Sequence, residues 1–456
     1  MPTLTEIKYS QLENRFDSEY YKPEYLEVED KLEKTKFVTL LKNVVKKSNK
    51  TFDPSKNITN YFYYIEIDGI NLVDGNFSFA KLKNHEAPSR ARKKLEYGDI
   101  LISTVRPNRN AVSLFLEKSN SYVCSTGFCV IESEKINPYF LFIFLKTKYS
   151  VYQLIRNTSA AMYPAVSEDD ILNIKIINPS KQFQLHIEKL VKEAFSKRNS
   201  ADQKYEQAKQ LLEEKLGLDK LKLKEEKTFE TRFFNVKENM RFDSEYYHPK
   251  YTQVKLRLVE LSNNYDVVEL KKIASLTTGK QQETFKELTN GVPFYSIKDI
   301  KKSTFSKVDI RYIRKDNHEK MKNSELKTND VLLAITGATI GKTGIFLENE
   351  GNISGDLARI RIKDDFKGKV DPFYILIYLE SLFGQVQINR NIYGATNKHL
   401  SLKSVEKILI SILPTPKQEQ ISKLIRESFD LRKESKALLN SARQKIEEMI
   451  ENATWK

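Results

Sequence analysis

The sequence predicts an α+β fold in which two β-rich domains, copies of one unit, are separated by two long helices. The duplication is indicated by a heptapeptide that occurs twice, letter for letter, at Arg15–Tyr21 and Arg241–Tyr247. Further along, Gly98–Leu101 corresponds to Asn329–Leu332. Because the spacing between matched positions drifts by only a few residues, we expect small loop insertions over a shared, domain-sized fold.

The chain therefore divides into six segments in the order arm, domain, helix, arm, domain, helix. In each copy a proline, Pro179 or Pro414, marks the change from short apolar runs to a long helical pattern. The first helical segment also includes a connector rich in lysine and glutamate after Gly217. The predicted boundaries are 1–36, 37–179, 180–228, 229–265, 266–415 and 416–456.

Local patterns predict the elements of the first copy. An amphipathic stretch follows Pro23, and proline suits the first turn of a helix, so a helix is expected over residues 24–34. Short runs rich in β-branched and aromatic residues, bounded by turn residues, predict strands. The strands are expected at 61–67, 99–105, 111–116, 127–131 and 171–177, with a helix at 138–156.

Both long helices carry small or apolar residues at spacings of three, four and seven. Such sustained heptads with charged flanks favour a coiled coil, and two at equivalent positions favour pairing with each other. The alternative is an ordinary amphipathic helix packed on a domain core. The seam residues are Ile187, Leu190, Ala194, Ala201, Ala208 and Leu211 in the first helix, and Ile421, Leu424, Ser428, Leu431, Ser435, Leu438, Ala442 and Met449 in the second.

The charge balance predicts a polyanionic partner. The chain has 76 Lys and Arg against 61 Asp and Glu, a formal net charge of +15. Such a basic chain favours nucleic acid over an anionic membrane surface. The longest apolar run, Phe140–Leu145, is far short of the ~20 residues of a membrane-spanning helix. Residues 1–10 lack the apolar core of a signal peptide, so a cytoplasmic protein without a membrane partner is expected.

Catalytic and metal-binding motifs are not evident. Gly337–Thr343 resembles a phosphate-binding loop, but three residues separate its glycines where the nucleotide-binding pattern has four. The five histidines show no metal-ligand spacing. Cys124 and Cys129 lie among aromatic and β-branched residues and are expected to be buried and reduced. We therefore predict no catalytic and no metal-binding residues.

The arrangement resembles the specificity (S) subunit of type I restriction-modification systems over essentially the whole chain. The resemblance is carried by the duplicated order of segments and by several short stretches. These are the repeated heptapeptide, Gly279-Lys280 after the first strand of the second domain, Gly337–Lys342, and Pro414 with Gln418 and Gln420 before the second long helix. In the first copy, Val105–Asn110 takes the place of Gly337–Lys342, which is a departure from the family pattern.

The resemblance implies a non-catalytic DNA reader. Each β-rich domain would be a target recognition domain for one half of a bipartite, asymmetric site in double-stranded DNA, and the long helices would pair as an antiparallel coiled coil. Methyltransferase (M) subunits, expected to be two, would use S-adenosylmethionine, and restriction (R) subunits would use ATP and Mg. This chain itself would hold no cofactor.

Loops that expose long hydrogen-bond donors are the expected DNA contacts. Arg, Asn and Gln can bond base edges in pairs, whereas Lys more often holds phosphate. The alternative for each residue is a solvated side chain. The candidates are Arg106, Asn108, Arg109 and Tyr163 in the first domain, and Lys280, Gln281, Gln282, Lys342, Asn397 and Lys398 in the second.

The repeated heptapeptide is expected to have a structural role, with its aromatic residues packing an arm against the long helix of the opposite copy and its Arg and Asp satisfying each other. A competing role is the docking of methyltransferase subunits, one per copy. The residues concerned are Arg15, Phe16, Asp17, Tyr20 and Tyr21, and Arg241, Phe242, Asp243, Tyr246 and Tyr247.

Two other classes of protein stay open. One is a non-catalytic coiled-coil scaffold or RNA-binding adaptor with duplicated binding domains, which duplex preference and steep salt dependence would distinguish from a DNA reader. The other, a fused restriction-modification enzyme, is disfavoured by the missing motifs.

Overall fold

A computed structural model describes residues 6–7, 12, 15–119, 121–158, 163–219, 221, 223, 226–301, 303–305 and 310–453. Most of residues 1–14 of the predicted first arm therefore lie outside the described part. The chain forms two compact units, residues 1–199 with 431–456, and residues 200–430. The two long helices, α5 (Lys181–Leu216) and α13 (Thr415–Ala453), contribute to both units.

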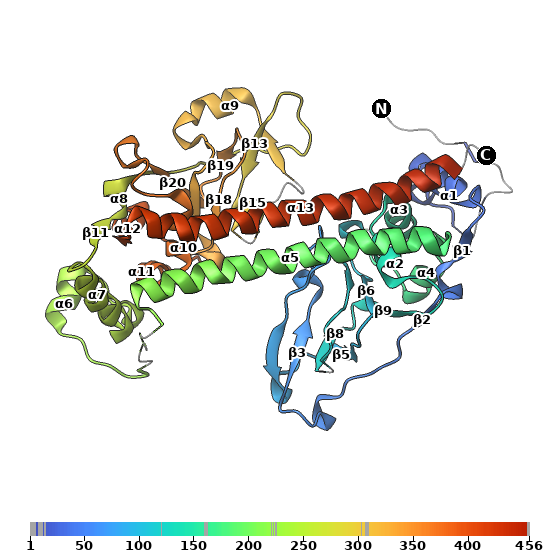
Figure 1. The fold of residues 1–456 in the computed structure, drawn as a ribbon, viewed down its shortest axis with the longest axis horizontal. Coiled ribbons are helices and arrows are strands. Elements are labelled where there is room, and N and C mark those ends of the chain that lie inside the picture. The colour runs from blue at the N-terminus through green and yellow to red at the C-terminus, as the bar shows by residue number, and fades with distance from the viewer. Residues whose placement is uncertain are drawn as a thin grey trace. The chain divides into compact units, whose positions relative to one another are not determined.

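In the first unit, two four-stranded sheets carry the β-rich domain (Figure 1). One has the order β2-β9-β6-β7 and is antiparallel, and the other has the order β4-β3-β8-β5 with β3 parallel to β8. The elements are α1 (Pro23–Glu33), β1 (Val38–Leu40), β2 (Val45–Lys47), β3 (Tyr61–Ile65), β4 (Ala80–Lys83), β5 (Ala91–Lys94), β6 (Ile100–Ser103), β7 (Val112–Leu114), β8 (Tyr122–Ser125), β9 (Phe128–Ser133), α2 (Pro138–Phe144), α3 (Lys148–Arg156), α4 (Glu168–Leu172) and β10 (Lys175–Ile177).

The second unit repeats this plan with an antiparallel sheet of order β12-β20-β17-β18. Its elements are α6 (Phe233–Asn239), α7 (Pro249–Leu261), β11 (Asp266–Glu269), α8 (Leu270–Ile273), β12 (Ala274–Thr278), β13 (Val292–Tyr295), β14 (Ile300–Lys301), β15 (Thr304–Phe305), β16 (Arg311–Ile313), α9 (Lys315–Lys320), β17 (Val331–Ala334), β18 (Thr343–Ile345), β19 (Asn352–Ile353), β20 (Leu357–Ile362), α10 (Pro372–Glu380), α11 (Leu382–Arg390), α12 (Leu402–Glu406) and β21 (Leu409–Ile412).

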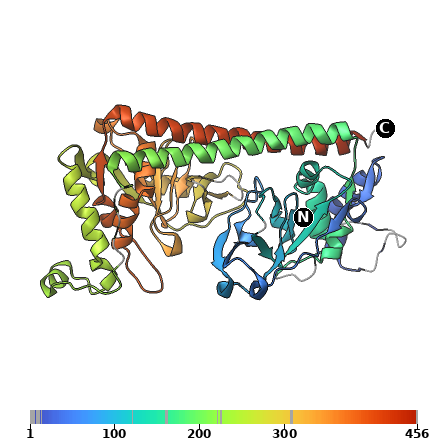
Figure 2. The ribbon, with the colours of Figure 1, turned by 60° about the horizontal axis from the view of Figure 1, so that its bottom comes forward.

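The long helices pair antiparallel within each unit. In the first unit the Ser435 hydroxyl donates to the Ala194 carbonyl oxygen at 2.7 Å, and in the second the Ser428 hydroxyl donates to that of Ala201, also at 2.7 Å. Figure 1 and Figure 2 both show α5 in green and α13 in red side by side. Ala and Ser at these seam positions are buried, and their small side chains allow the helix backbones to approach closely. The predicted antiparallel coiled coil is confirmed.

Two element predictions for the first copy are wrong. The predicted strand 171–177 is a strand only at Lys175–Ile177, because Ser167 and Asp170 form a reciprocal capping box that starts helix α4. The predicted helix 138–156 is two helices, α2 and α3. The Thr147 hydroxyl donates to the Phe144 carbonyl oxygen at 2.7 Å and the Thr147 backbone is extended, so the first helix ends and a second one begins.

Candidate nucleic-acid interface

The second-domain candidates sit on loops at one end of the sheet β12-β20-β17-β18. Antiparallel pairing places Thr278 opposite Ala358, and Ala334 opposite Leu357, so the loops after β12 and β17 leave the same end of the sheet. Lys280–Gln282 follow the first of these strands. A Cβ at Gly279 would lie 1.8 Å from the Ile353 carbonyl oxygen, so only glycine permits this close approach of the two loops.

A third loop, residues 393–399, joins this cluster through backbone hydrogen bonds. The Gly337 amide donates to the Lys398 carbonyl oxygen at 2.9 Å, and the Leu400 amide donates to that of Ile335 at 2.8 Å. Asn397 and Lys398 are both exposed beside the glycine-containing loop. The structure therefore brings these two candidates next to the loop that ends at Lys342.

The Gly337–Thr343 stretch closes a β-hairpin. The Ala334 amide donates to the Lys342 carbonyl oxygen at 2.8 Å, and strand β18 follows where a phosphate-binding loop would lead into a helix. Lys342 is half-buried. Burial lowers the pKa of the Lys342 amine, and the neighbouring positive charge of Lys301 lowers it further. An anion next to both lysines would relieve their repulsion, as a DNA phosphate would.

The first domain carries its candidates at the equivalent edge of the sheet β2-β9-β6-β7. Here the loop after β6 contains a short 3-10 helix at Pro107–Arg109, flanked by Arg106 and Asn110 with left-handed φ values of 50° and 52°. Such values are unusual for residues other than glycine and cluster at functional sites. Asn108 and Arg109 are exposed, and Arg109 lies 3.7 Å from the exposed carboxylate of Asp68.

Tyr163 joins the same loop from a distant part of the chain. The Arg106 amide donates to the Pro164 carbonyl oxygen at 2.7 Å, and the Arg106 guanidinium lies 5.8 Å from the centre of the Tyr163 ring. Tyr163 is 63% exposed, so its ring is available to a partner. All four first-domain candidates therefore share one loop cluster. Their contact with DNA, like that of the second-domain candidates, stays a prediction.

Sequence reasoning missed several basic and aromatic residues on both domains. Lys301 meets Lys342 because Ser303 bridges to Gly344, a long-range pairing that no local pattern announces. On the first domain, the Lys81 amine lies 4.0 Å from the centre of the Tyr61 ring, and Phe79 is 49% exposed on the same hairpin. The cross-strand register β3–β4, which pairs Lys81 with Tyr63, is the information that would have found this basic, aromatic edge.

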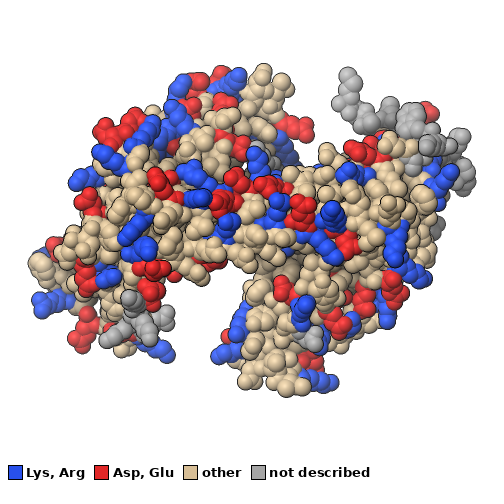
Figure 3. Space-filling model, in the orientation of Figure 1, with Lys and Arg blue, Asp and Glu red and all other residues tan. Residues whose placement is uncertain are grey.

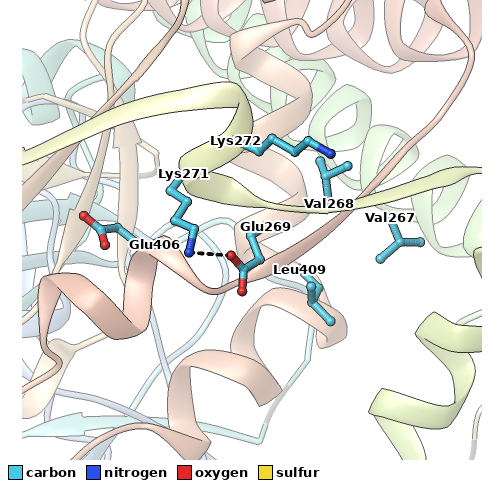
Figure 4. Close-up of a pocket in the computed structure, with 7 residues that line it drawn as sticks. All are labelled: Val267, Val268, Glu269, Lys271, Lys272, Glu406 and Leu409. Carbon is cyan, nitrogen blue, oxygen red and sulfur yellow. Dashed lines mark ion pairs between the residues drawn. The ribbon is translucent and has the colours of Figure 1, made fainter.

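A hollow of about 600 Å³ lies at the other end of the sheet β12-β20-β17-β18, where α8 leads into β12 (Figure 4). Lys271 and Glu269, which line it, form an ion pair at 2.7 Å. The charges along the long helices are also paired across the seam, at 2.6 Å between Lys197 and Glu434. On the face shown in Figure 3, basic and acidic residues are interspersed. Lys271 and Lys197 thus have acidic partners in these regions.

The repeated heptapeptide is held by the same kinds of contact in both copies, although Tyr20 is buried and Tyr246 is only half-buried. Tyr20 is buried, with the guanidinium of Arg156 from the end of α3 at 4.0 Å and that of Arg15 at 4.7 Å from its ring centre. The Arg156 Nε donates to the Tyr20 carbonyl oxygen at 3.0 Å. In the second copy, Arg390 and Arg241 lie 4.4 and 4.7 Å from the Tyr246 ring.

Arg and Asp of the motif satisfy each other as expected. Arg15 Nε lies 2.8 Å from Asp17, and this hydrogen bond lowers the pKa of the Asp17 carboxyl. Arg241 and Asp243 do the same at 2.6 Å, with the same effect on the Asp243 pKa. The Tyr21 and Tyr247 hydroxyls donate to the carbonyl oxygens of these arginines at 2.9 and 2.8 Å. In each domain these contacts therefore hold the motif in a compact turn.

The expectation that Phe16 and Phe242 pack an arm is wrong. Their side chains are 85% and 81% exposed. Tyr20 and Tyr246 lie against the last residue of α3 and of α11 in their own domain, Arg156 and Arg390. The tight turn from Asp17 into the 3-10 helix Ser18–Tyr21 buries Tyr20 and Tyr21, and leaves Phe16 outside it.

Over the described part of the chain, no cluster of three or more His, Cys, Asp or Glu is arranged to hold a metal ion. Within the same residues, the helices are too short or too polar to cross a bilayer. Cys124 and Cys129 are free and fully buried, as predicted, and burial raises the pKa of the Cys129 thiol to about 12. Neither thiol is thus suited to be a nucleophile.

A family model described as the type I restriction modification DNA specificity domain matches the chain twice, over residues 33–210 and 262–441. The chain belongs to this family. The two matches cover both β-rich domains and most of both long helices. The predicted fold class of tandem target recognition domains with a coiled coil is therefore confirmed.

Named relatives of this specificity family are distant. The chain is 23% identical over 398 residues to the MjaVIII specificity subunit of Methanocaldococcus jannaschii, covering 85% of each chain. It is 29% identical over 149 residues to the HindI specificity subunit of Haemophilus influenzae, and 24% identical over 169 residues to the EcoBI specificity subunit of Escherichia coli. These two matches cover 30% and 36% of this chain and span 32% and 34% of the relatives' lengths.

Solved structures of the family are similar as well. The HsdS subunit from Thermoanaerobacter tengcongensis is 21% identical, with 91% of this chain and 95% of that chain covered and a TM-score of 0.33. The type I S subunit from M. genitalium is 11% identical at the same coverage, with a TM-score of 0.37.

Proposed function

We propose that this chain is the sequence-specific DNA-binding subunit of a type I restriction-modification complex. It reads a bipartite, asymmetric site in double-stranded DNA, one half-site per recognition domain, and directs methyltransferase and restriction subunits to that site. The observation that carries this proposal is the loop cluster at the same edge of equivalent sheets in both domains, built from different residues in each copy. A conserved frame with divergent loops suits two different half-sites.

Each loop cluster offers two kinds of contact. Arg106, Asn108 and Arg109 in the first domain, and Gln281 and Asn397 in the second, carry the donors and acceptors that distinguish base edges. Lys342 and Lys398 would hold phosphates and fix the register of the domain on the duplex. A helix of the length of α5, 36 residues, spans about 54 Å, more than the ~34 Å of one DNA turn, so the helix pair is long enough to separate two half-sites.

The chain itself is proposed to be non-catalytic and free of cofactors. Methyl transfer by the M subunits would use S-adenosylmethionine, and DNA cleavage by the R subunits would use ATP and Mg. The complex would act in the cytoplasm. The exposed Phe16 and Phe242, at equivalent places in the two copies, support docking of two M subunits, whereas the buried Tyr20 supports a packing role for the rest of the motif.

The test is methylation-sensitive sequencing of host DNA with the gene intact and deleted. We expect the loss of one split, asymmetric methylated motif on deletion. An unchanged methylome in cells that express active M subunits would contradict the proposal and favour the scaffold or RNA-binding adaptor, whose affinity for duplex DNA would be no higher than for RNA.

A further inference from the structure

Glu380, the last residue of α10, is the centre of a hydroxyl network in the second unit. Its Oε1 accepts hydrogen bonds from the Ser303 hydroxyl at 2.6 Å and the Thr343 hydroxyl at 2.7 Å. Its Oε2 lies 2.7 Å from the Tyr205 hydroxyl, which is also 2.7 Å from Ser303 Oγ. One carboxylate thus joins α10 to helix α5, to the β14–β15 turn and to strand β18.

This arrangement is more than generic packing. Tyr205, Ser303 and Thr343 are buried, and the described residues give Glu380 hydroxyl partners and no ion pair. Glu380 itself is half-buried, and the hydroxyls fix the direction of its carboxylate through short, charge-assisted hydrogen bonds. An apolar side chain would fill the same space without setting the relative position of the four elements.

The network fixes the backbone beside Lys342, a predicted DNA contact, and beside Lys301. Thr343 directly follows Lys342, and Ser303 lies two residues after Lys301. Ser303 is held at a left-handed φ of 65°, and its carbonyl oxygen accepts from the Ile345 amide at 3.0 Å. Moving Glu380 would therefore shift both lysines together.

The same network reaches the long helices. Tyr205 belongs to α5, and its ring stacks on Phe429 of α13 with the ring centres 6.2 Å apart and an interplanar angle of 23°. The network thus sets the position of the loops relative to the helix pair. Tyr205 contacts Glu380 through its hydroxyl and Phe429 through its ring.

The first copy has an opposite charge at the equivalent position. Lys146 lies as far beyond Pro138 of α2 as Glu380 lies beyond Pro372 of α10. Its amine donates to the Leu72 carbonyl oxygen at 3.0 Å. Leu72 lies one place before the counterpart of Ser303, since the strand registers make Ile65 equivalent to Tyr295. Both copies therefore anchor the equivalent loop from the end of the equivalent helix, with different chemistry.

We propose that Glu380 and Tyr205 are positioning residues for the second domain, which hold its Lys301 and Lys342 in the orientation at which the neighbouring loops read their half-site. Lys146 has the corresponding role in the first domain. The inference rests on the proposed function, because it assigns the network to half-site reading.

The experiment compares Glu380→Gln, Tyr205→Phe and Lys146→Met in the full chain. Three duplexes are used: the complete site from the methylome, and the same site with one or the other half-site scrambled. The ratio of dissociation constants for scrambled and complete duplexes measures discrimination at each half-site. Glu406→Gln, at the opposite end of the second sheet beside the hollow of Figure 4, is the matched control.

We expect Glu380→Gln and Tyr205→Phe to lower discrimination about tenfold at one half-site only, the half-site that also responds to Asn397→Ala; this is the size of one lost base contact. Lys146→Met should lower discrimination at the other half-site, and Glu406→Gln at neither. If Glu380→Gln does not fold, Tyr205→Phe, which removes a single hydroxyl, carries the test.

Two outcomes overturn the inference. One is unchanged discrimination at both half-sites. The other is an equal loss at both half-sites that follows a lowered melting temperature, as a general loss of stability would give. Failure of the proposed function looks different, since the wild-type chain would then prefer no bipartite duplex at all.

Discussion

At the scale of single residues, the two copies use one buried aspartate in different surroundings. The Asp99 carboxylate accepts from the Glu96 amide at 2.8 Å, and that of Asp330 accepts from the Lys327 amide at 2.7 Å. Asp330 also forms an ion pair with Arg361 at 2.6 Å. In the first copy an acidic residue, Glu132, stands in the register position of Arg361, and the charge of Lys50 lowers the pKa of Asp99 less than burial raises it.

The stability of the first domain should consequently depend on pH through Asp99. Burial raises the pKa of the Asp99 carboxyl to about 6. The folded state thus favours the protonated acid, and this contribution is full below the ordinary pKa of 3.8 and is lost as the pH rises through about 6. Because of Asp99, the free energy of unfolding of the wild type should fall by about 3 kcal/mol between about pH 4 and pH 7. Asp99→Asn should abolish this fall, and urea unfolding measures the effect.

Asp330→Asn is the matched control for that series. It should lower the free energy of unfolding at neutral pH, because Arg361 loses its buried partner. If Asp99→Asn kept the wild-type dependence of stability on pH, the assignment to Asp99 would be wrong.

The repeated motif makes a second prediction at this scale. Tyr20→Ala removes a buried ring that lies between two guanidinium groups, and should lower the free energy of unfolding by about 3 kcal/mol. Tyr246→Ala should cost less, because Tyr246 is only half-buried. Melting curves and assembly with M subunits measure the effect, while the DNA sequence that is read should stay the same.

Phe16→Ala separates the two roles of the motif. Because Phe16 is 85% exposed, the change should leave stability unchanged, and a specific loss of M-subunit binding would assign Phe16 to docking. Normal assembly and an altered DNA sequence preference in the Tyr20→Ala variant would contradict the packing role.

At the scale of elements, the seam of the helix pair depends on small residues. Ala201 is fully buried, and its carbonyl oxygen accepts from Ser428. Ala201→Leu should force the helices apart and cost about 1–3 kcal/mol in stability, measured by thermal unfolding. Gln203→Leu on the exposed face of α5 is the control and should have little effect. Equal melting temperatures for the two variants would contradict close packing at this seam.

The sequence predicted elements well where one local signal dominated. Heptad spacing placed Ala194, Ala201, Ser428 and Ser435 on the buried seam. The strand prediction failed at residues 171–172, because apolar residues suggested a strand while the capping box of Ser167 and Asp170 starts a helix there. The joining of loop 336–342 to loop 393–399 depends on long-range backbone bonds, so only the structure shows that Asn397 and Lys398 lie beside Gly337.

At the scale of the whole molecule, the excess of basic residues should appear as a steep salt dependence. With a net charge of +15 and about 6–10 phosphate contacts, the affinity for duplex DNA should fall by about a thousandfold or more between about 50 and 200 mM salt. Fluorescence anisotropy over a salt series measures this. Lys280→Ala should reduce the slope of the log–log plot by about one.

Lys271→Ala is the control for the salt series, since Lys271 lies at the opposite end of the sheet and is paired with Glu269. A slope that did not change with Lys280→Ala, or fell equally with Lys271→Ala, would remove Lys280 from the interface.

The duplication itself was evident from the sequence, because seven identical residues and matched strand positions survive in both copies. The six predicted segment boundaries remain predictions. The sequence did not predict the exposure of Phe16 or the opposite charges of Lys146 and Glu380 at equivalent positions. Each depends on which face of a turn or helix meets a neighbour in space.

The two buried thiols also have a practical consequence. Cys124 and Cys129 are fully buried with raised pKa values, and the sequence has no other cysteine. A maleimide reagent will therefore react with an introduced surface cysteine and leave the native ones untouched. The wild-type chain can thus serve as its own labelling background, with a fluorophore placed on either recognition domain and no cysteine to be removed first.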